Sequence, residues 1–237
     1  MRYLLKISYD GSKYFGFQRQ NDLKSVQRDI ELILSTFFHK EIIIKGAGRT
    51  DRGVHAKGQC AHFDVDTDFN TSELKRYMNK KLDYAKIRSV TRVSDDFHAR
   101  FSVLRKHYSY KISFNRNDFN NDYCFFQKNL DIKLMKKASK LFIGIHNFQN
   151  FVSGTRDNYD CIIYKITFRR YFNKLIIHFY GKSFYRYMVR NMVGALIDVG
   201  KYKVKPERIT ELLNSDKTDR MLSTAPAKGL TLEKIYY

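Results

Sequence analysis

Hydrophobic and polar residues alternate over the first nine positions of the chain, a period typical of a half-buried β-strand. One face of this segment carries Tyr3, Leu5, Ile7 and Tyr9. After Ser25 the spacing changes to that of an amphipathic helix. Its apolar stripe consists of Val26, Ile30, Ile33, Leu34 and Phe37. The pattern therefore predicts a strand over 2–9 and a helix that starts at Ser25.

Three more strands and a second helix are predicted in the first half of the chain. β-Branched residues favour a short strand over 41–45, and further strands are expected over 59–65 and 85–93. Thr71 is the expected N-cap of the helix between the last two strands. Its apolar residues are Leu74, Tyr77, Met78 and Leu82. The order is strand, helix, strand, strand, helix, strand.

The same order recurs in the second half. Strands are predicted over 105–114, 161–169, 174–180 and 230–236. Helices are predicted over 131–143 and 183–199, and a shorter one begins at Pro206.

Two consecutive units of this order indicate an α+β protein built from two tandem ferredoxin-like, or split βαβ, subdomains. Such subdomains can place mostly antiparallel sheets side by side, with a central basic cleft. We expect an N-terminal subdomain over 1–102 and a C-terminal subdomain over 103–237. No tract of Gly, Pro or Ser marks the join near 95–104, so we expect the halves to share an extensive interface.

The charge balance points to a polyanionic partner. Lys and Arg number 44 against 24 Asp and Glu, a formal net charge of +20 for 237 residues. Such an excess attracts polyanions over a long range. The 19 Phe and 17 Tyr residues supply faces on which unstacked RNA bases can lie. An anionic membrane surface is the alternative, but no long basic amphipathic helix supports it.

Cysteine usage and apolar runs argue against several classes of protein. Cys60, Cys124 and Cys161 are odd in number and far apart, so neither a disulfide framework nor a structural zinc site is indicated. We expect all three to be small buried side chains. No apolar run is long enough to span a bilayer, and we expect a cytoplasmic protein without a metal.

The stretch richest in candidate chemistry is 46–59, Gly-Ala-Gly-Arg-Thr-Asp-Arg-Gly-Val-His-Ala-Lys-Gly-Gln. Its glycines allow positive φ, and Arg49 and Arg52 flank Asp51 and favour its ionised form. An ordinary Asx-turn or a surface ion pair is an alternative role for Asp51. An ionised carboxylate in a basic loop suits an enzyme that acts on an anionic polymer.

Five segments in sequence order carry a resemblance to a known family. They are Tyr-Asp-Gly-Ser-Lys-Tyr-Phe-Gly-Phe-Gln-Arg-Gln at 9–20, Gly-Arg-Thr-Asp-Arg-Gly-Val-His at 48–55, Asp-Phe-His-Ala-Arg-Phe-Ser at 96–102, Phe184 with Met-Val-Arg-Asn-Met-Val-Gly at 188–194, and Ala-Pro-Ala with Gly-Leu at 225–230. Together they resemble the signatures of the tRNA pseudouridine synthase A family and extend over nearly the whole chain.

The resemblance implies isomerisation of uridine to pseudouridine in the anticodon stem-loop of tRNA, at positions 38 to 40. The C1′–N1 bond breaks, the uracil rotates and a C1′–C5 bond forms, without a cofactor. Asp51 corresponds to the catalytic aspartate, as a nucleophile or as a base. The resemblance also implies a homodimer whose two subunits both contact the tRNA.

The resemblance assigns two further catalytic residues. Tyr108 corresponds to a tyrosine that stacks on the flipped uracil, and Arg190 to an arginine that pairs with Asp51. Spacing alone favours a core aromatic for Tyr108 and a phosphate-binding or surface role for Arg190. The further candidates for substrate binding are Lys13, Arg49, Arg52, His98, Arg100 and Arg186.

Three positions depart from the family pattern. Arg52 stands where Ala is common, Phe17 where Trp is usual, and Cys161 near a position that is often Arg. Two other hypotheses remain open. One is a non-enzymatic RNA-binding protein, and the other is a metal-dependent nuclease that uses Asp51 with Asp95 and Asp96.

Overall fold

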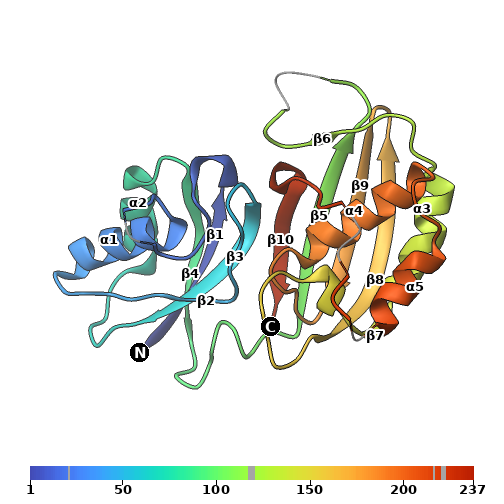
Figure 1. The fold of residues 1–237 in the computed structure, drawn as a ribbon. Helices are drawn as coiled ribbons and strands as arrows, with labels where there is room; N and C mark the ends of the chain where they lie inside the picture. Colours follow the sequence, from blue (N-terminus) through green and yellow to red (C-terminus); the bar gives the residue numbers. More distant parts are fainter. Residues whose placement is uncertain (21, 117–120, 216, 220–222) are drawn as a thin grey trace. The chain divides into compact units, whose positions relative to one another are not determined.

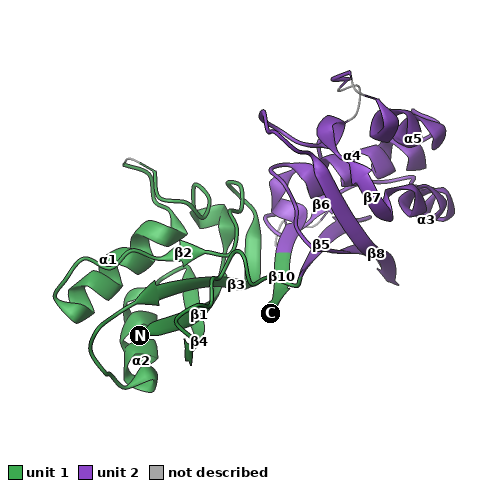
Figure 2. Cartoon of the chain, turned by 90° about the horizontal axis from the view of Figure 1, so that it is seen from below, with its two compact units in different colours: residues 1–104, 232–237 green, residues 105–231 purple. Residues whose placement is uncertain are grey.

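The computed structural model describes residues 1–20, 22–116, 121–215, 217–219 and 223–237 (Figure 1). The chain divides into two compact units (Figure 2). Unit 1 consists of Met1–Leu104 with Leu232–Tyr237, and unit 2 consists of Arg105–Thr231. Helices and mostly antiparallel strands occur in both units, which confirms the expected α+β class.

Unit 1 contains the predicted order of elements. They are β1 (Arg2–Tyr9), α1 (Val26–Phe38), β2 (Lys45–Gly46), β3 (His55–Asp64), α2 (Thr71–Lys81) and β4 (Ala85–Val93), with a 3-10 turn, η1 (Gly11–Lys13), after β1. Strand β1 lies between β4 and β3 and is antiparallel to both. Strand β2 pairs with the far end of β3, where Lys45 lies opposite His62.

The core of unit 1 follows the predicted alternation along β1. Tyr3, Leu5, Ile7 and Tyr9 are all buried. Helices α1 and α2 lie against this face of the strands. Phe37 of α1 contacts Tyr77 of α2, with ring centroids 5.0 Å apart, and Phe38 packs 6.1 Å from Phe63 of β3.

Two local predictions for unit 1 are wrong. The strand expected over 41–45 is reduced to β2, because side chains of α1 bind the backbone that would otherwise form a strand. The Ile44 N–H donates to Glu31 Oε1 at 3.0 Å, and the Ile42 N–H donates to Ser35 Oγ at 2.9 Å. The N-cap of α2 is Asn70 rather than Thr71, since Asn70 Oδ1 accepts from the N–H groups of Ser72 and Glu73.

Unit 2 carries the remaining elements. They are β5 (Arg105–Ser113), β6 (Phe125–Phe126), α3 (Ile132–Ser139), η3 (Lys140–Phe142), β7 (Gly144–Asn147), η4 (Gln149–Phe151), β8 (Asp160–Tyr171), β9 (Lys174–Gly181), α4 (Met188–Gly200), α5 (Glu207–Asn214) and η5 (Ala227–Gly229). The strands lie in the order β5-β9-β8-β7. Neighbours in this order are antiparallel, whereas β6 runs parallel to β5.

Helix α4 lies across one face of these strands (Figure 1). Leu175, Ile177 and Phe179 of β9 are fully buried. Cys60, Cys124 and Cys161 are buried free thiols, as expected. Cys161 also donates a hydrogen bond to the Ser183 carbonyl at 2.9 Å. The Cys161 thiol therefore binds the backbone just before α4 within unit 2.

The second half departs from its predicted order in two ways. Strands β6 and β7 were missed, because segments this short show no resolvable alternation. The helix predicted over 183–199 begins only at Met188. Tyr187 adopts a left-handed conformation with φ +63°, which an α-helix cannot continue through.

The last strand, β10 (Leu230–Tyr236), begins in unit 2 and ends in unit 1 (Figure 2). In unit 1 it lies along β3, and the Lys57 ammonium of β3 is 2.9 Å from the Glu233 carboxylate. Tyr237 OH donates to the Ala99 carbonyl at 2.8 Å, and the Tyr237 ring packs against Phe97.

His62 lies on the face of β3 opposite to the helices and is 1% exposed. Its Nδ1 accepts from the Ala99 N–H at 3.1 Å. Its Nε2 is buried without a hydrogen-bond partner among the described residues. Burial, helped by the nearby Arg2 charge, lowers the pKa of His62 to about 4. The ring is therefore neutral in the folded protein at pH 7.

We predict that unit 1 loses stability as the pH falls from 6.5 to 4. In the unfolded chain His62 gains a proton near its ordinary pKa of 6.5, whereas the folded protein resists protonation down to about 4. The free energy of unfolding, measured in urea across this range, should fall less steeply for His62→Asn, which keeps an acceptor for Ala99. Equal slopes for the two proteins would contradict the prediction.

Gly16 lies where the segment after β1 approaches the loop between β2 and β3. Its φ is +105°, and a Cβ there would lie 3.0 Å from the Thr50 carbonyl oxygen and 3.4 Å from Arg52 N. Glycine is thus required by both the backbone conformation and the close approach of the two segments.

Gly16→Ala should therefore destabilise the protein more than Gly154→Ala does. Gly154 has a similar φ of +92°, but a Cβ there would meet no atom within 4 Å. Both variants bear the strain of an L-residue at positive φ, roughly 1–3 kcal/mol. Only Gly16→Ala adds the contact with Thr50. Urea unfolding of both variants measures the difference, and equal losses would show that the close approach is unimportant.

Candidate active site

The loop that carries Asp51 spans residues 47–54, between β2 and β3 of unit 1. Its base is fixed to β3, since the Ala47 N–H donates to the Cys60 carbonyl at 2.8 Å. At its tip the Val54 N–H donates to the Asp51 carbonyl at 3.1 Å, which closes a turn. Asp51 therefore lies in a defined turn, and the residue is half-buried.

The segment that follows β1 packs directly against this loop. The Phe17 N–H donates to the Thr50 carbonyl at 3.2 Å. The Phe17 ring fills the space beside Gly46, just before the loop. Beyond the loop, His55 Nδ1 lies 3.2 Å from Asp10 Oδ1 and accepts from the Gly11 N–H. Strand β3 and the segment after β1 thus hold the Asp51 loop.

Exposed cations lie on the Asp51 loop and on the segment after β1. Arg49 and Arg52 flank Asp51 and are exposed. The Arg52 guanidinium lies 4.3 Å from the centroid of the Phe15 ring, a cation–π contact that holds it at the surface. Lys13 is exposed at the end of η1, with its ammonium 6.0 Å from the Tyr84 ring. These cations can bind phosphate groups near Asp51.

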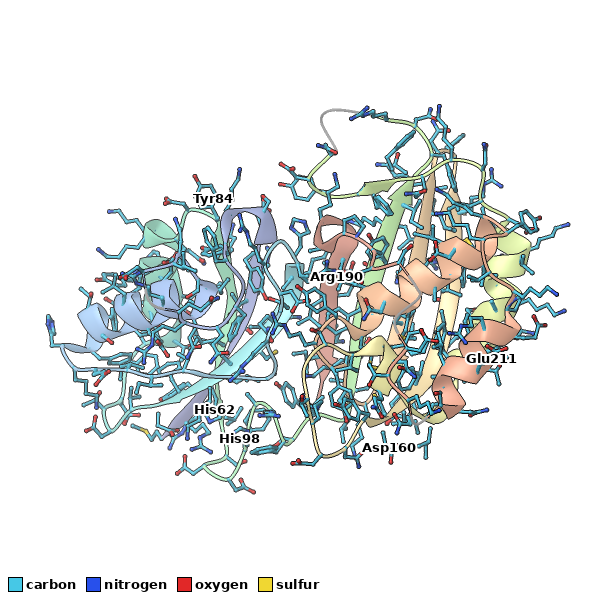
Figure 3. All side chains as sticks on the ribbon, in the orientation of Figure 1. His62, Tyr84, His98, Asp160, Arg190 and Glu211 are labelled. Atoms are coloured by element: carbon cyan, nitrogen blue, oxygen red, sulfur yellow. The ribbon has the colours of Figure 1, made fainter. Side chains whose placement is uncertain are left out.

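His98 and Arg100 lie elsewhere in unit 1. The His98 ring packs against His62 with centroids 4.7 Å apart, and the two residues lie together in Figure 3. Because His62 is seven positions along β3 from His55, this site is roughly 20 Å from the end of the Asp51 loop that leads into β3. His98 Nδ1 accepts from the Arg100 N–H at 3.1 Å, so the ring shapes the turn that presents Arg100.

Tyr108 lies on β5 of unit 2 and is 8% exposed. Its ring meets the Phe184 ring edge-on, with centroids 5.2 Å apart and planes at 75°. Phe184 belongs to the segment just before α4. The neighbouring Tyr110 is fully buried, and its OH donates to the Pro226 carbonyl at 2.8 Å. Burial raises the pKa of Tyr110, so its phenol stays neutral.

Arg190 lies in the first turn of α4 and is held by neighbours within unit 2 (Figure 3). Its Nε donates to the Ala225 carbonyl at 2.8 Å, and its guanidinium lies 4.3 Å from the Tyr187 ring centroid. The Ala225 N–H donates in turn to the Arg190 carbonyl. Arg186 is exposed, with its guanidinium 5.4 Å from the same ring. Arg190 therefore has a fixed orientation.

Several residues that fix these side chains were not predicted from the sequence. In unit 2 they are Tyr187 and Ala225, and in unit 1 they are Tyr9, Thr50 and Gln59. Gln59 is fully buried, and its Nε2 donates to the Gly48 carbonyl at 3.0 Å. A polar residue at the start of a predicted buried strand was the available signal for Gln59.

The carboxylates of the nuclease hypothesis do not gather. Asp95 accepts a hydrogen bond from the Arg2 N–H at the start of β1. The end of β1 that contacts the Asp51 loop is Tyr9, roughly 20 Å away along the strand. Within the described part of the chain, no three His, Cys, Asp or Glu residues are grouped as metal ligands would be. No described helix has the length and apolarity needed to cross a membrane.

Comparisons with known proteins give one consistent result. A family profile described as "tRNA pseudouridine synthase" matches residues 6–102 and 138–237. The tRNA pseudouridine synthase A of Thermotoga sp. (strain RQ2) is 40% identical over 239 residues, which cover 98% of this chain and 97% of the relative. That of Dictyoglomus thermophilum is 40% identical over 241 residues, which cover 98% of both chains.

A third relative of lower identity carries the same name. The tRNA pseudouridine synthase A of Aster yellows witches'-broom phytoplasma (strain AYWB) is 36% identical over 238 residues, which cover 99% of this chain and 98% of the relative. The profile match covers both units. The Asp51 loop, β5 with Tyr108 and the tail at Ala225 all lie within segments shared with these proteins or with the profile. The chain belongs to the tRNA pseudouridine synthase family.

Proposed function

We propose that this chain isomerises uridine to pseudouridine in the anticodon stem-loop of tRNA, at positions 38 to 40, with Asp51 as the catalytic residue. Family membership gives the coarser statement, an isomerase that acts on tRNA. The single observation that supports the role of Asp51 is its loop. The half-buried Asp51 lies in a turn that β3 and the segment after β1 hold, with exposed arginines on both sides.

The proposed reaction needs only a positioned carboxylate and a rotating base. The C1′–N1 bond of uridine breaks, the uracil turns, C5 bonds to C1′, and the proton on C5 is exchanged for one on N1. Asp51 acts either as the nucleophile at the sugar or the ring, or as the base that removes a sugar proton. Both routes require a carboxylate whose direction is fixed.

Unit 2 contributes the other two proposed catalytic residues. Tyr108 stacks on the uracil once it has been flipped out of the stem, and its contact with Phe184 keeps the ring in place. Arg190 pairs with Asp51 through Nη1 and Nη2, while its Nε is bound to the Ala225 carbonyl. An arginine held in this way can orient a carboxylate without rotating away.

The remaining candidates bind the substrate. Arg49, Arg52 and Lys13 contact phosphates near the target nucleotide, and Arg100 and Arg186 extend the basic surface along the RNA. His98 supports Arg100 by holding its turn. The net charge of +20 favours this electrostatic binding.

The larger assembly is part of the same proposal. Two tandem split βαβ subdomains, 1–102 and 103–237, have mostly antiparallel sheets side by side and provide a central basic cleft for the anticodon arm. The end of β10, Leu232–Tyr237, belongs to unit 1 and so completes the first of them. The enzyme works as a cytoplasmic homodimer, and the tRNA contacts both subunits. No cofactor takes part in the reaction. The order of elements in unit 1 supports the split βαβ assignment.

The first test replaces the carboxylate by an amide. Asp51→Asn should lower the rate of pseudouridine formation by at least about 10²-fold, because an amide is neither a nucleophile nor a base at neutral pH. Its affinity for tRNA should stay within a few-fold of wild type. Pseudouridine mapping of tRNA gives the product, and Asp66→Asn, at an exposed surface ion pair, is the matched control.

Three results would contradict the proposal. Full product formation by Asp51→Asn would remove the catalytic role of Asp51. Binding of tRNA without product by the wild type would favour the non-enzymatic RNA-binding hypothesis. Cleavage of the RNA chain, or loss of activity in EDTA with prefolded tRNA, would favour the nuclease hypothesis.

A second test separates Arg190 from Arg52. Arg190→Ala should reduce turnover at saturating tRNA far more than it reduces affinity, because the proposed partner of Arg190 is Asp51. Arg52→Ala should weaken tRNA binding and lower the salt dependence of affinity by about one phosphate contact. Arg190→Lys, which keeps the charge but loses the fork of donors, should also be impaired. An affinity loss with unchanged turnover in Arg190→Ala would assign Arg190 to phosphate binding.

A further inference from the structure

Thr50, the residue before Asp51, is fixed at two atoms by two different segments of unit 1. Its Oγ1 lies 2.8 Å from the hydroxyl of Tyr9, the last residue of β1. Its carbonyl oxygen accepts from the Phe17 N–H at 3.2 Å. Tyr9 is 6% exposed and Thr50 is 7% exposed, so water competes little for this hydrogen bond.

The hydroxyl of Tyr9 belongs to a buried network beneath the loop. The Gln59 side chain is its second hydrogen-bonding neighbour, and Gln59 Nε2 donates to the Gly48 carbonyl at 3.0 Å. The network therefore reaches the loop both at Gly48 and at Thr50. Burial raises the pKa of Tyr9 to about 12, while the hydrogen bonds to Thr50 and Gln59 lower it. The phenol is neutral at physiological pH.

We propose that Tyr9 is a positioning residue that holds the Asp51 carboxylate in its reactive orientation through the hydrogen bond to Thr50. This inference rests on the proposed catalytic role of Asp51. Tyr9 is buried in the core of unit 1 and acts on the reaction only through Thr50. The rigid end of a central strand is thereby connected to the tip of a loop.

The hydrogen bond between Tyr9 and Thr50 limits the conformational freedom of the loop. Thr50 is the residue whose backbone sets the direction of Asp51, and its Oγ1 bond to Tyr9 restrains its side chain and φ together. When a reacting group is displaced by about 1 Å, the rate can fall by about 10²-fold. Tyr9→Phe removes only the hydroxyl and keeps the ring, which packs 6.2 Å from Tyr14 and 6.5 Å from Phe17.

The alternative is that Tyr9 contributes only to stability, as any buried aromatic does. Tyr3→Phe is the matched control for this reading. Tyr3 lies on the same face of β1, is 3% exposed and stacks 5.8 Å from Phe63, at the end of the strand away from the loop. Both variants lose one phenol hydroxyl from the same core face.

The experiment measures the single-turnover rate of pseudouridine formation at saturating tRNA, the Kd for tRNA and the thermal unfolding midpoint. Tyr9→Phe should lower the rate by about 10- to 100-fold with a Kd within about twofold of wild type. Tyr3→Phe should keep the wild-type rate, even when its unfolding midpoint falls as far as that of Tyr9→Phe. A wild-type rate in Tyr9→Phe, or equal rate losses in both variants, would overturn the proposal.

A second pair of variants tests the bond itself. Thr50→Ser keeps a hydroxyl for Tyr9 and should retain most of the rate, whereas Thr50→Val should lose about as much as Tyr9→Phe. The double variant Tyr9→Phe/Thr50→Val should be no slower than either single variant, because both remove the same interaction. Losses that multiply in the double variant would show that the two residues act independently and would overturn the proposal.

Asp51→Asn, measured in parallel, separates the proposed function of the protein from the positioning role of Tyr9. Activity in Asp51→Asn would remove the proposed function and the positioning role together. An inactive Asp51→Asn together with a fully active Tyr9→Phe would leave the proposed function intact and refute the role of Tyr9 alone.

Discussion

The attachment of the Asp51 loop to the framework of unit 1 is the constraint on which the proposed chemistry depends. A loop is the most mobile type of segment, yet a carboxylate that reacts with a sugar or a base must keep one direction. Here the restraints come from both neighbours of the loop. Strand β3 holds Ala47, and the segment after β1 holds Thr50. The glycine at position 16 allows that segment to approach closely enough.

In unit 2, contacts with a short tail of the chain hold the proposed catalytic arginine in place. A short tail around Ala225 and Pro226 binds both α4 and β5, through Arg190 and Tyr110. A backbone carbonyl takes one donor of the arginine, and a tyrosine ring covers the guanidinium. The side chain of Arg190 is thereby restrained in direction by contacts that involve no substrate. Contacts inside each unit therefore restrain the proposed catalytic residues of that unit.

The sequence predicted elements well where periodicity was strong and local. Strand β1 begins and ends at its predicted positions, and helix α1 begins next to its predicted start, because alternation and an apolar stripe report directly on one buried face. The strand predicted over 41–45 did not form in full because Glu31 and Ser35, on the preceding helix α1, bind the backbone of this segment. The predicted start of α4 was wrong because nothing in the sequence marks Tyr187 as a residue with a left-handed backbone conformation.

In the candidate site too, local features were predictable from the sequence and tertiary contacts were not. The loop of Asp51 was recognisable because its glycines and arginines form a dense local pattern. The family profile matches a segment that includes this loop. The restraints on the loop were not recognisable. Tyr9 looks like any core residue of an alternating strand, and its contact with Thr50 crosses 41 positions of sequence. Such partners emerge only when the tertiary structure is known.

The path of β10 has a consequence for biosynthesis. Unit 1 includes Leu232–Tyr237, so the whole of unit 2 must be translated before the first unit receives its final strand. A nascent chain that has just emerged through Leu104 lacks the partner of Lys57 on β3 and the aromatic cover of Phe97. The ribosome therefore delivers a finished Asp51 unit only late in synthesis, and cotranslational folding of this chain cannot proceed strictly from one unit to the next.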